Sequence, residues 1–373
     1  PFVHLRVASG YSLQYGASHP SALVEAAAGH DMDTLALTDR DGLYGAVRFA
    51  KACLRAGIAP VVGAALAVAN GPRRPERGTT RAVVLAESRA GWGSLCRLVS
   101  ATHARGDRGS PVTTRALVGE HRDEAVVVLG PDSDLGVALA RRDERAAEGV
   151  LGDWLEVVEP HQLVVGVTNH HLGGRAGHGR GGEGTAHLAG RMLAFADAHG
   201  LTGVLTNAVR MARKSDAPIA DVLDAARRLV PLDVRNVDRR NAEGYLKSGK
   251  EMLATAEEVA RLAGRRDATR LIGDTRHLAL RCRLDPVADI GLGEIHLPEF
   301  PGGLAELRAR CESGLAARYA APAASVVDRL DEELAVIGQM GFAAYFLTVA
   351  QVVDSVKEMG IRVAARGSGA GSL

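Results

Sequence analysis

The sequence predicts an α/β fold built on a mainly parallel sheet or barrel, followed by a helical region. Over the first two-thirds of the chain, seven short apolar runs alternate with amphipathic stretches. The runs are almost continuously apolar, as expected for strands buried on both faces, and their alternation with helices is typical of a parallel sheet. From about Asp216 the pattern changes to helices without strands. Periodicity alone leaves a closed barrel and an open doubly wound sheet as alternatives.

The spacing of apolar residues and the positions of turn residues predict the individual strands and helices. Pro20 after Ser18 marks a helix start, and Gly29, Gly57 and Gly200 mark helix ends. The expected strands are 2–7, 34–38, 59–68, 81–86, 125–129, 163–167 and 202–206. The expected helices are 20–29, 43–56, 91–103, 135–147, 186–199, 217–229, 250–262, 270–281, 304–319, 326–340 and 344–359. A turn-rich join at 297–303 places a domain boundary near residue 290.

Length and composition exclude several classes of protein. The 373 residues suffice for two or three domains, and a hydrophobic content of 46% can supply a sizeable core. A net charge of +1 speaks against nucleic-acid binding through overall basicity, but it leaves room for a local basic groove. No stretch is apolar enough for a membrane span or a secretory signal, so we expect a cytoplasmic protein without membrane contact. The start at Pro1 and the end inside a glycine-rich run predict a fragment.

Three local patterns are candidates for chemistry. The segment 364–372 is rich in glycine and serine, and its free amides suit either phosphate binding or a plain turn. Asp39 ends a buried strand, where it fits either a site residue or a helix cap. His170, His171, His178 and His187 gather in a glycine-rich stretch, but no carboxylate or cysteine stands at ligand spacing, which favours solvated histidines over a metal site. The four cysteines are far apart in the sequence and lack the paired spacings of a zinc site or a disulfide framework, so we expect them to be single buried thiols.

The ordered set of strings along the whole chain resembles the N-terminal part of the bacterial C-family DNA polymerases, the polymerase III alpha subunits and their error-prone relatives. The set ends in two specific strings, MGFAAYFL at 340–347 and RGSGAGSL at 366–373. The earlier strings lie at 2–7, 9–12, 35–45, 60–63, 84–95, 205–207, 245–248 and 281–282. The strings at 16–20 and 41–45 favour the error-prone branch.

The resemblance implies a domain order. Residues 1–232 would form a polymerase-and-histidinol-phosphatase (PHP) domain, a distorted seven-stranded β/α barrel. Residues 233–290 would be its helical extension, and 291–373 would begin the polymerase palm. A palm loop would bind the phosphates of the incoming nucleotide through Arg366, Gly367, Ser368, Gly371 and Ser372.

The resemblance also implies partners and a cofactor. The full-length protein would act on a DNA primer–template and deoxynucleotides with magnesium, and it would meet a sliding clamp and other replication or translesion proteins through regions outside this sequence. The catalytic aspartates of the palm would lie there too. This fragment would therefore bind no cofactor and carry no polymerase activity alone.

The departures from the family pattern concern the PHP metal site. Asp39 is retained, but the other ligand positions hold alanine, tyrosine or arginine. A multinuclear metal site needs carboxylates and neutral imidazoles, whereas guanidiniums repel cations. The sequence therefore predicts a metal-free PHP scaffold, in which the arginines pair with Asp39 or bind an anion. The vestigial site comprises Arg6, Ala8, Tyr15, Asp39, Arg40, Ala65, Arg81, Ala208 and Arg210.

Two other functions stay open. One is a stand-alone PHP-type metal-dependent phosphoesterase or 3′–5′ exonuclease, against which the altered ligand positions and the palm-like end both speak. The other is a non-catalytic scaffold protein.

Overall fold

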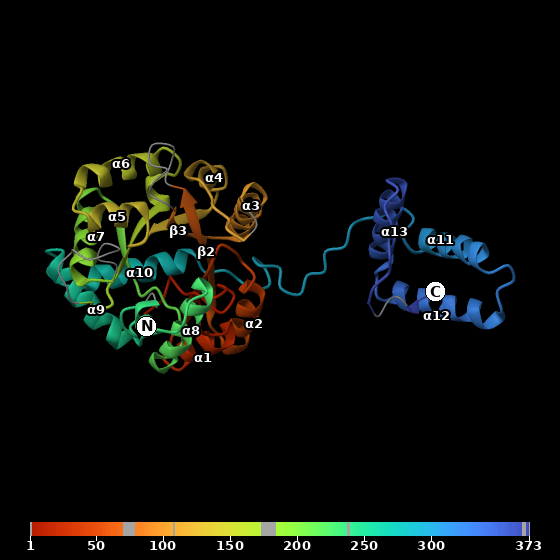
Figure 1. The fold of residues 1–373 in the computed structure, drawn as a ribbon, viewed down its shortest axis with the longest axis horizontal. Helices are drawn as coiled ribbons and strands as arrows, with labels where there is room; N and C mark the ends of the chain where they lie inside the picture. Colours follow the sequence, from red (N-terminus) through yellow and green to blue (C-terminus); the bar gives the residue numbers. More distant parts are fainter. Residues whose placement is uncertain are drawn as a thin grey trace. The chain divides into compact units, whose positions relative to one another are not determined.

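The computed structural model describes residues 2–69, 79–106, 109–172, 184–236, 239–367 and 371–372. The chain divides into two compact units, Pro1–Leu292 and Gly293–Leu373 (Figure 1). The finer division at residue 232 stays a prediction.

The first unit is built on a single six-stranded sheet in which sequence order and spatial order agree. Five strands run parallel, and β3 is antiparallel to both of its neighbours. Because the strands carry almost continuous buried runs, each is covered on both faces. The strands are β1 Thr34–Arg40, β2 Ala59–Ala69, β3 Thr79–Ala86, β4 Ala125–Leu129, β5 Leu163–Thr168 and β6 Thr202–Thr206.

The seventh predicted strand, at 2–7, is an irregular segment that links the two edges of the sheet. On one side Ala36 N–H donates to His4 O at 3.0 Å, and Thr38 N–H donates to Val7 O at 2.7 Å. On the other side Val7 forms an isolated parallel bridge with Val209. The prediction of a regular strand here is wrong because only Val7 pairs in strand fashion, but the segment still lies between β1 and the residues that follow β6.

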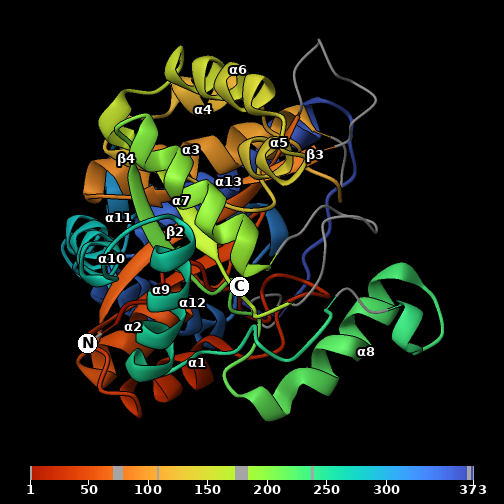
Figure 2. The ribbon, with the colours of Figure 1, turned by 90° about the vertical axis from the view of Figure 1, so that its left-hand side faces the viewer.

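Ten α-helices of the described part of the first unit pack around this sheet. Figure 2 shows α7, which lies against β5 and α9. The helices are α1 Pro20–Ala28, α2 Ala46–Ala56, α3 Arg89–Arg105, α4 Arg115–Glu120, α5 Asp134–Ala140, α6 Glu144–Leu155, α7 Ala186–Ala198, α8 Ala217–Arg228, α9 Gly249–Leu262 and α10 Thr269–Arg281.

Two helices differ from the sequence prediction. The single helix predicted at 135–147 is interrupted, because Arg142 adopts a left-handed φ of 58° and Asp143 caps a new helix by accepting from Ala146 N–H at 3.0 Å. The prediction also missed α4, whose six residues are too few for a helical period.

The core of the first unit has two parts. The larger part packs the outer helices onto the sheet through side chains such as Leu35, Phe49, Leu98 and Trp154. The smaller part packs the other face of the sheet against the N-terminal segment and α10, whose contributions include Val3, Leu5, Leu278 and Cys282. The inside of the curled sheet is therefore filled by side chains, and polar chemistry is left to the strand ends.

The second unit contains the helices α11 Gly303–Arg318, α12 Ala324–Gln339 and α13 Ala343–Glu358. Its core is small and consists of Leu307, Leu330, Leu334, Ala343 and Leu347. Across the described ranges, no single helix is long and apolar enough to cross a membrane, and only the bent pair α12–α13 meets that criterion of length and composition jointly.

Candidate functional site

The candidate site of the first unit lies where the parallel strands end. Residues just after β1, β5 and β6 adopt left-handed backbone although none is glycine: Asp41 at φ 54°, His171 at 54° and Ala208 at 43°. Such conformations cost of order 1–3 kcal/mol each and gather at functional sites. The carboxyl ends of parallel strands are also where active sites form in β/α barrels. We call this edge the mouth of the unit.

Asp39, at the end of β1, is buried and held by serine side chains. Its carboxylate accepts hydrogen bonds from Ser9 N–H at 2.7 Å, from Ser9 Oγ at 2.9 Å and from Ser12 Oγ at 2.7 Å. Burial raises the pKa of Asp39, and these hydrogen bonds partly oppose that rise. A side chain at Gly45 would place its Cβ 2.7 Å from Asp39 Oδ2, so this position needs glycine.

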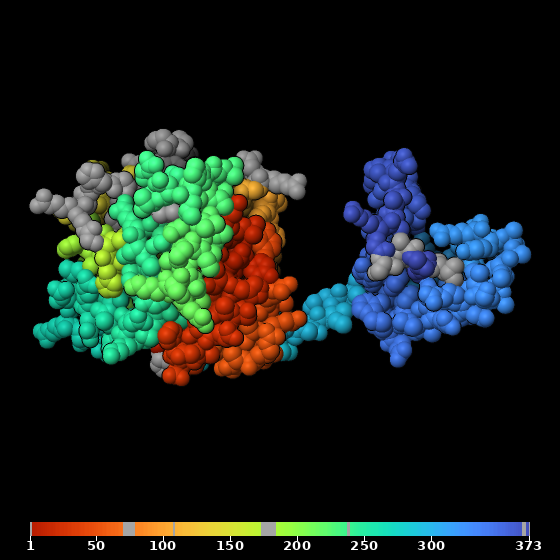
Figure 3. All heavy atoms as spheres, turned by 60° about the horizontal axis from the view of Figure 1, so that its bottom comes forward, coloured from red at the N-terminus to blue at the C-terminus, as the bar shows by residue number. Residues whose placement is uncertain are grey.

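Two arginines of the vestigial site gather at Tyr15. The guanidinium carbon of Arg40 lies 3.1 Å from the centroid of the Tyr15 ring, and that of Arg210 lies 4.1 Å from it. Arg210 also donates to Asp224 at 2.7 and 3.2 Å and to Tyr15 O at 3.1 Å. Figure 3 shows the N-terminal part of the chain, in red, beside the green region that contains α8, the helix that supplies Asp224.

The other two arginines each pair with an acidic residue near the mouth. Arg6 forms an ion pair with Asp132, which follows β4. Arg81, on β3, donates to Asp41 at 2.8 and 3.1 Å and to Ala65 O at 2.7 Å. The expectation that an arginine pairs with Asp39 is wrong for these residues, because hydrogen bonds from Ser9 and Ser12 hold that carboxylate and the arginines bond other groups. Their partners Asp41, Asp132 and Asp224 were not singled out from the sequence.

The three alanines of the vestigial site contribute only through their backbone atoms and backbone conformation. Ala8 N–H donates to Val209 O at 2.9 Å, which joins the N-terminal segment to the chain after β6. Ala65 O accepts from Asp41 N–H at 3.1 Å as well as from Arg81. Ala208 supplies the left-handed turn after β6. None of them offers a side chain that can hold a metal ion.

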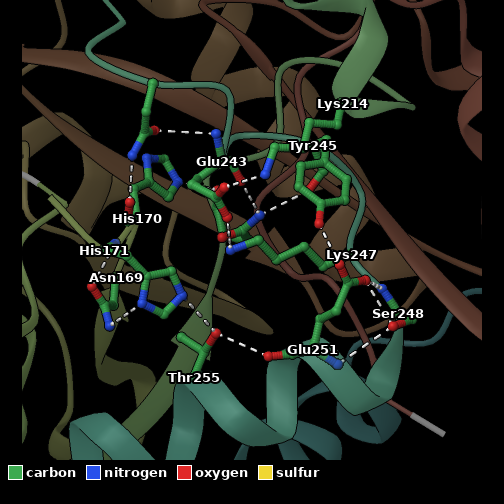
Figure 4. A network of polar contacts seen from close by, with 12 residues as sticks. Asn169, His170, His171, Lys214, Glu243, Tyr245, Lys247, Ser248, Glu251 and Thr255 are labelled. Carbon is green, nitrogen blue, oxygen red and sulfur yellow. Dashed lines mark hydrogen bonds and ion pairs between the residues drawn. The ribbon is translucent and has the colours of Figure 1, made fainter.

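A second polar network joins the ends of β5 and β6 to the segment 241–251 (Figure 4). Lys247 is buried and pairs with Glu243 at 2.8 Å, and Lys214 approaches the same carboxylate at 2.7 Å. Burial raises the pKa of Glu243, but the two ammonium groups outweigh this effect and lower the pKa to about 2. Asn207 donates to Glu243 O at 2.8 Å and to Tyr245 O at 2.7 Å, so the network fixes this segment beside the mouth.

The histidines divide between this network and solvent. His170 Nε2 bonds Asn207 O at 2.8 Å, and burial lowers the pKa of His170 to about 4. His171 Nδ1 lies 2.9 Å from Glu258 Oε2, and Figure 4 shows His171 between Asn169 and Thr255. The interpretation as solvated loop histidines is therefore wrong for His170, whereas His171 is exposed although it pairs with Glu258, and His187 is exposed on α7. His178 lies outside the described residues. Among described residues, no three His, Cys, Asp or Glu side chains gather in a way that could hold a metal ion.

The predicted phosphate loop belongs to the second unit. Arg366 is exposed, and Gly367 has a φ of 116°, which requires glycine. Ser372 Oγ donates to Glu333 on α12 at 2.6 Å, and Gly371 is exposed. Ser368 lies outside the described residues. The loop belongs to the second unit and the mouth to the first.

Comparison with known proteins finds a matching family for each of the two parts of the chain. Residues 4–170 match the PHP domain family, and residues 305–373 match the family described as the bacterial DNA polymerase III alpha NTPase domain. DNA polymerase III subunit alpha of Pseudomonas fluorescens is 30% identical over 394 residues, which cover 100% of this chain and 31% of that protein. The error-prone DNA polymerase of Mycobacterium bovis is 31% identical over 387 residues and is covered to 33%.

Solved structures give a looser likeness. A proposed metal-dependent phosphoesterase from Bifidobacterium adolescentis aligns with a TM-score of 0.41 and 12% identity, over 70% of this chain and 96% of that one. An amidohydrolase from Chromobacterium violaceum aligns with a TM-score of 0.37 and 18% identity, over 56% of this chain and 88% of that one.

The two family matches agree with the order predicted from the sequence, a PHP domain followed by a polymerase III alpha segment. Over its whole length the chain is similar, at 30–31% identity, to bacterial DNA polymerase III alpha subunits and error-prone DNA polymerases. It spans about a third of the length of the curated relatives it matches. The Escherichia coli K12 alpha subunit is 31% identical, the same value as the error-prone relative, so identity does not favour one branch.

Proposed function

We propose that this chain is the PHP and early palm part of a DNA-directed DNA polymerase, and that its PHP unit is a metal-free scaffold. One observation carries the scaffold proposal: guanidinium groups, three of them paired with carboxylates, stand at the positions where the family pattern would place metal ligands. The pairs are Arg6–Asp132, Arg81–Asp41 and Arg210–Asp224.

The donor set at the mouth does not fit a divalent metal. Its carboxylates are already engaged by arginines or, at Asp39, by serines. A doubly charged ion about 5 Å from one guanidinium would be repelled by about 7 kcal/mol at an effective dielectric constant of about 20. The same ion pairs join elements of the unit: Arg6–Asp132 ties the N-terminal segment to the chain after β4, Arg81–Asp41 ties β3 to the end of β1, and Arg210–Asp224 ties the chain after β6 to α8. Such links are the work of a scaffold.

The polymerase proposal rests on the whole-chain similarity and on the palm-like second unit. In the full-length protein, magnesium would supply charge neutralisation at the attacking and leaving oxygens of nucleotidyl transfer. Residues outside this chain would hold that magnesium and would carry most contacts with the DNA primer–template and a sliding clamp. The residues of this chain would contribute to the binding of the nucleotide's phosphates.

For the PHP unit we expect no tightly bound metal. After incubation with zinc or manganese and desalting, elemental analysis of the purified protein should find less than about 0.1 metal ion per chain, because the mouth presents guanidiniums instead of free ligands. Metal near one or more equivalents would contradict the proposal. So would a metal-dependent 3′–5′ exonuclease activity that Asp39→Ala abolishes.

For the phosphate loop we expect Arg366→Ala or Ser372→Ala in the full-length protein to raise the KM for deoxynucleotides about tenfold. Each change removes a donor to phosphate, and a hydrogen bond to a charged group contributes about 1.5–3 kcal/mol. Steady-state primer extension measures the effect. Arg362→Ala is the matched control, because Arg362 is an exposed arginine just outside the loop. Equal kinetics in all three variants would show that the loop is only a turn.

A further inference from the structure

The four arginines of the mouth differ in their partners. Arg6, Arg81 and Arg210 each have an acidic partner. Arg40 has none: within the described part of the chain, no hydrogen bond or ion pair reaches its guanidinium, and its contact is the ring of Tyr15 at 3.1 Å. Asp39, its neighbour in sequence, is turned to Ser9 and Ser12. The mouth therefore holds four guanidiniums and four carboxylates, but the carboxylate of Asp39 is bonded by serines and, among the residues described, Arg40 has no acidic partner in direct contact.

The surroundings make this unpaired charge unfavourable. Arg40 is half-buried, and burial lowers the pKa of its guanidinium. The ring of Tyr15 and the carboxylate of Asp132 oppose this, while the positive charges of Arg81 and Arg6 add to it. A guanidinium nevertheless stays protonated in proteins. A partly desolvated cation beside two others is stabilised most effectively by an anion.

The geometry is also fixed before any ligand arrives. The backbone N–H of Arg40 donates to Ser12 Oγ at 2.9 Å, and Ser12 Oγ donates to Asp39 at 2.7 Å. The guanidinium carbon lies 3.1 Å from the centroid of the Tyr15 ring, and no side-chain N–H of Arg40 bonds an acceptor in the described part of the chain, so these donors remain for a ligand. The N–H edge of a guanidinium matches two oxygens of a tetrahedral oxyanion, and phosphate meets it in a bidentate manner.

From this arrangement we infer that the mouth is a metal-independent binding site for a phosphate group, with Arg40 as its principal ligand and with Arg6 and Arg81 contributing positive potential. The inference rests on the proposed absence of metal in the PHP unit. The phosphate could be free orthophosphate or the 5′-terminal phosphate of a nucleic acid, since both present the same oxygens.

The test is a calorimetric titration of the EDTA-treated protein with sodium phosphate at low ionic strength. We expect binding by the wild type and at least a tenfold weaker affinity in Arg40→Gln. The matched control is Arg55→Gln, which removes the same charge from an exposed position of α2 and should leave the affinity unchanged. Arg40→Lys, which keeps the charge but loses the fork, should bind with intermediate affinity, and it replaces Arg40→Gln if that variant does not fold.

The outcomes separate this inference from the proposal before it. Equal loss in Arg40→Gln and Arg55→Gln, or no binding by the metal-free wild type, would overturn the phosphate site. Binding of phosphate only after zinc or manganese is added would overturn the metal-free scaffold together with it. A second titration compares an oligonucleotide with and without a 5′-phosphate: an Arg40-dependent preference for the phosphorylated form identifies a nucleic-acid end as the ligand, and its absence beside orthophosphate binding identifies the free ion.

Discussion

Replacing Asp224 with alanine is expected to lower the unfolding free energy of the first unit by about 3–5 kcal/mol. The carboxylate is fully buried and accepts from Arg210 at 2.7 and 3.2 Å and from Arg227 at 3.0 Å. The substitution takes away the carboxylate that pairs with the guanidinium of Arg210, which is itself only 9% exposed. Breaking a buried ion pair from one side has a cost of this size. The chain's two tryptophans, Trp92 and Trp154, both lie in the first unit, so their fluorescence in a urea titration reports its unfolding.

The exposed pair Asp233–Arg235 provides the control. Its N–O distance is 2.9 Å, but both groups are open to solvent, so Asp233→Ala should lower the unfolding free energy far less than Asp224→Ala does. The double variant Arg210→Met/Asp224→Leu should recover part of the loss, because it removes the buried guanidinium together with the carboxylate, and Arg227, the other donor to Asp224, is more exposed. Equal effects of Asp224→Ala and Asp233→Ala would mean that the buried pair does not stabilise the mouth.

The strands could be predicted from sequence because their signal is local. The six strands of the sheet carry continuous apolar runs, and that pattern depends only on burial on both faces. The segment at 2–7 shows the limit of this reasoning. Its side chains are as apolar as those of a strand, but its hydrogen bonds are divided between β1 and Val209, which lies about 200 residues away. Composition cannot reveal that division.

The candidate site was predictable only in part, because its residues also pair with partners that lie far away in the sequence. The arginines stood out because they occupy positions where the family resemblance expects ligands. Their partners did not, since Asp132 is 126 residues from Arg6 and Asp41 is 40 residues from Arg81. With 44 acidic residues in the chain, nothing local distinguishes these few. Ser9 and Ser12 carry no signal of their own either, although they decide that Asp39 pairs with hydroxyls and not with an arginine.

The first unit should also lose stability as the pH falls from about 6.5 to 4. His4 is buried, and its Nε2 bonds Lys247 O at 2.9 Å. Its Nδ1 has no partner among described residues, so a proton there would be a buried, unpaired donor. Burial lowers the pKa of His4 to about 4, the charge of Lys247 and that of His30 act in the same direction, and the hydrogen bond to Lys247 O and the charge of Glu251 oppose them.

The direction of this change in stability follows from the pH at which His4 takes up a proton in the folded and in the unfolded chain. The unfolded chain binds a proton at His4 near pH 6.5 and the folded chain only near pH 4, so the contribution of His4 is complete above 6.5 and is lost as the pH falls through 4. A difference of this size corresponds to about 3 kcal/mol. In urea titrations at pH 7.5 and 4, His4→Gln should reduce the loss between the two pH values by about this amount. A remainder should persist, because His170 titrates in the same direction. The exposed His187→Gln should lose as much as the wild type, and an identical loss in His4→Gln would show that His4 is not held neutral by its burial.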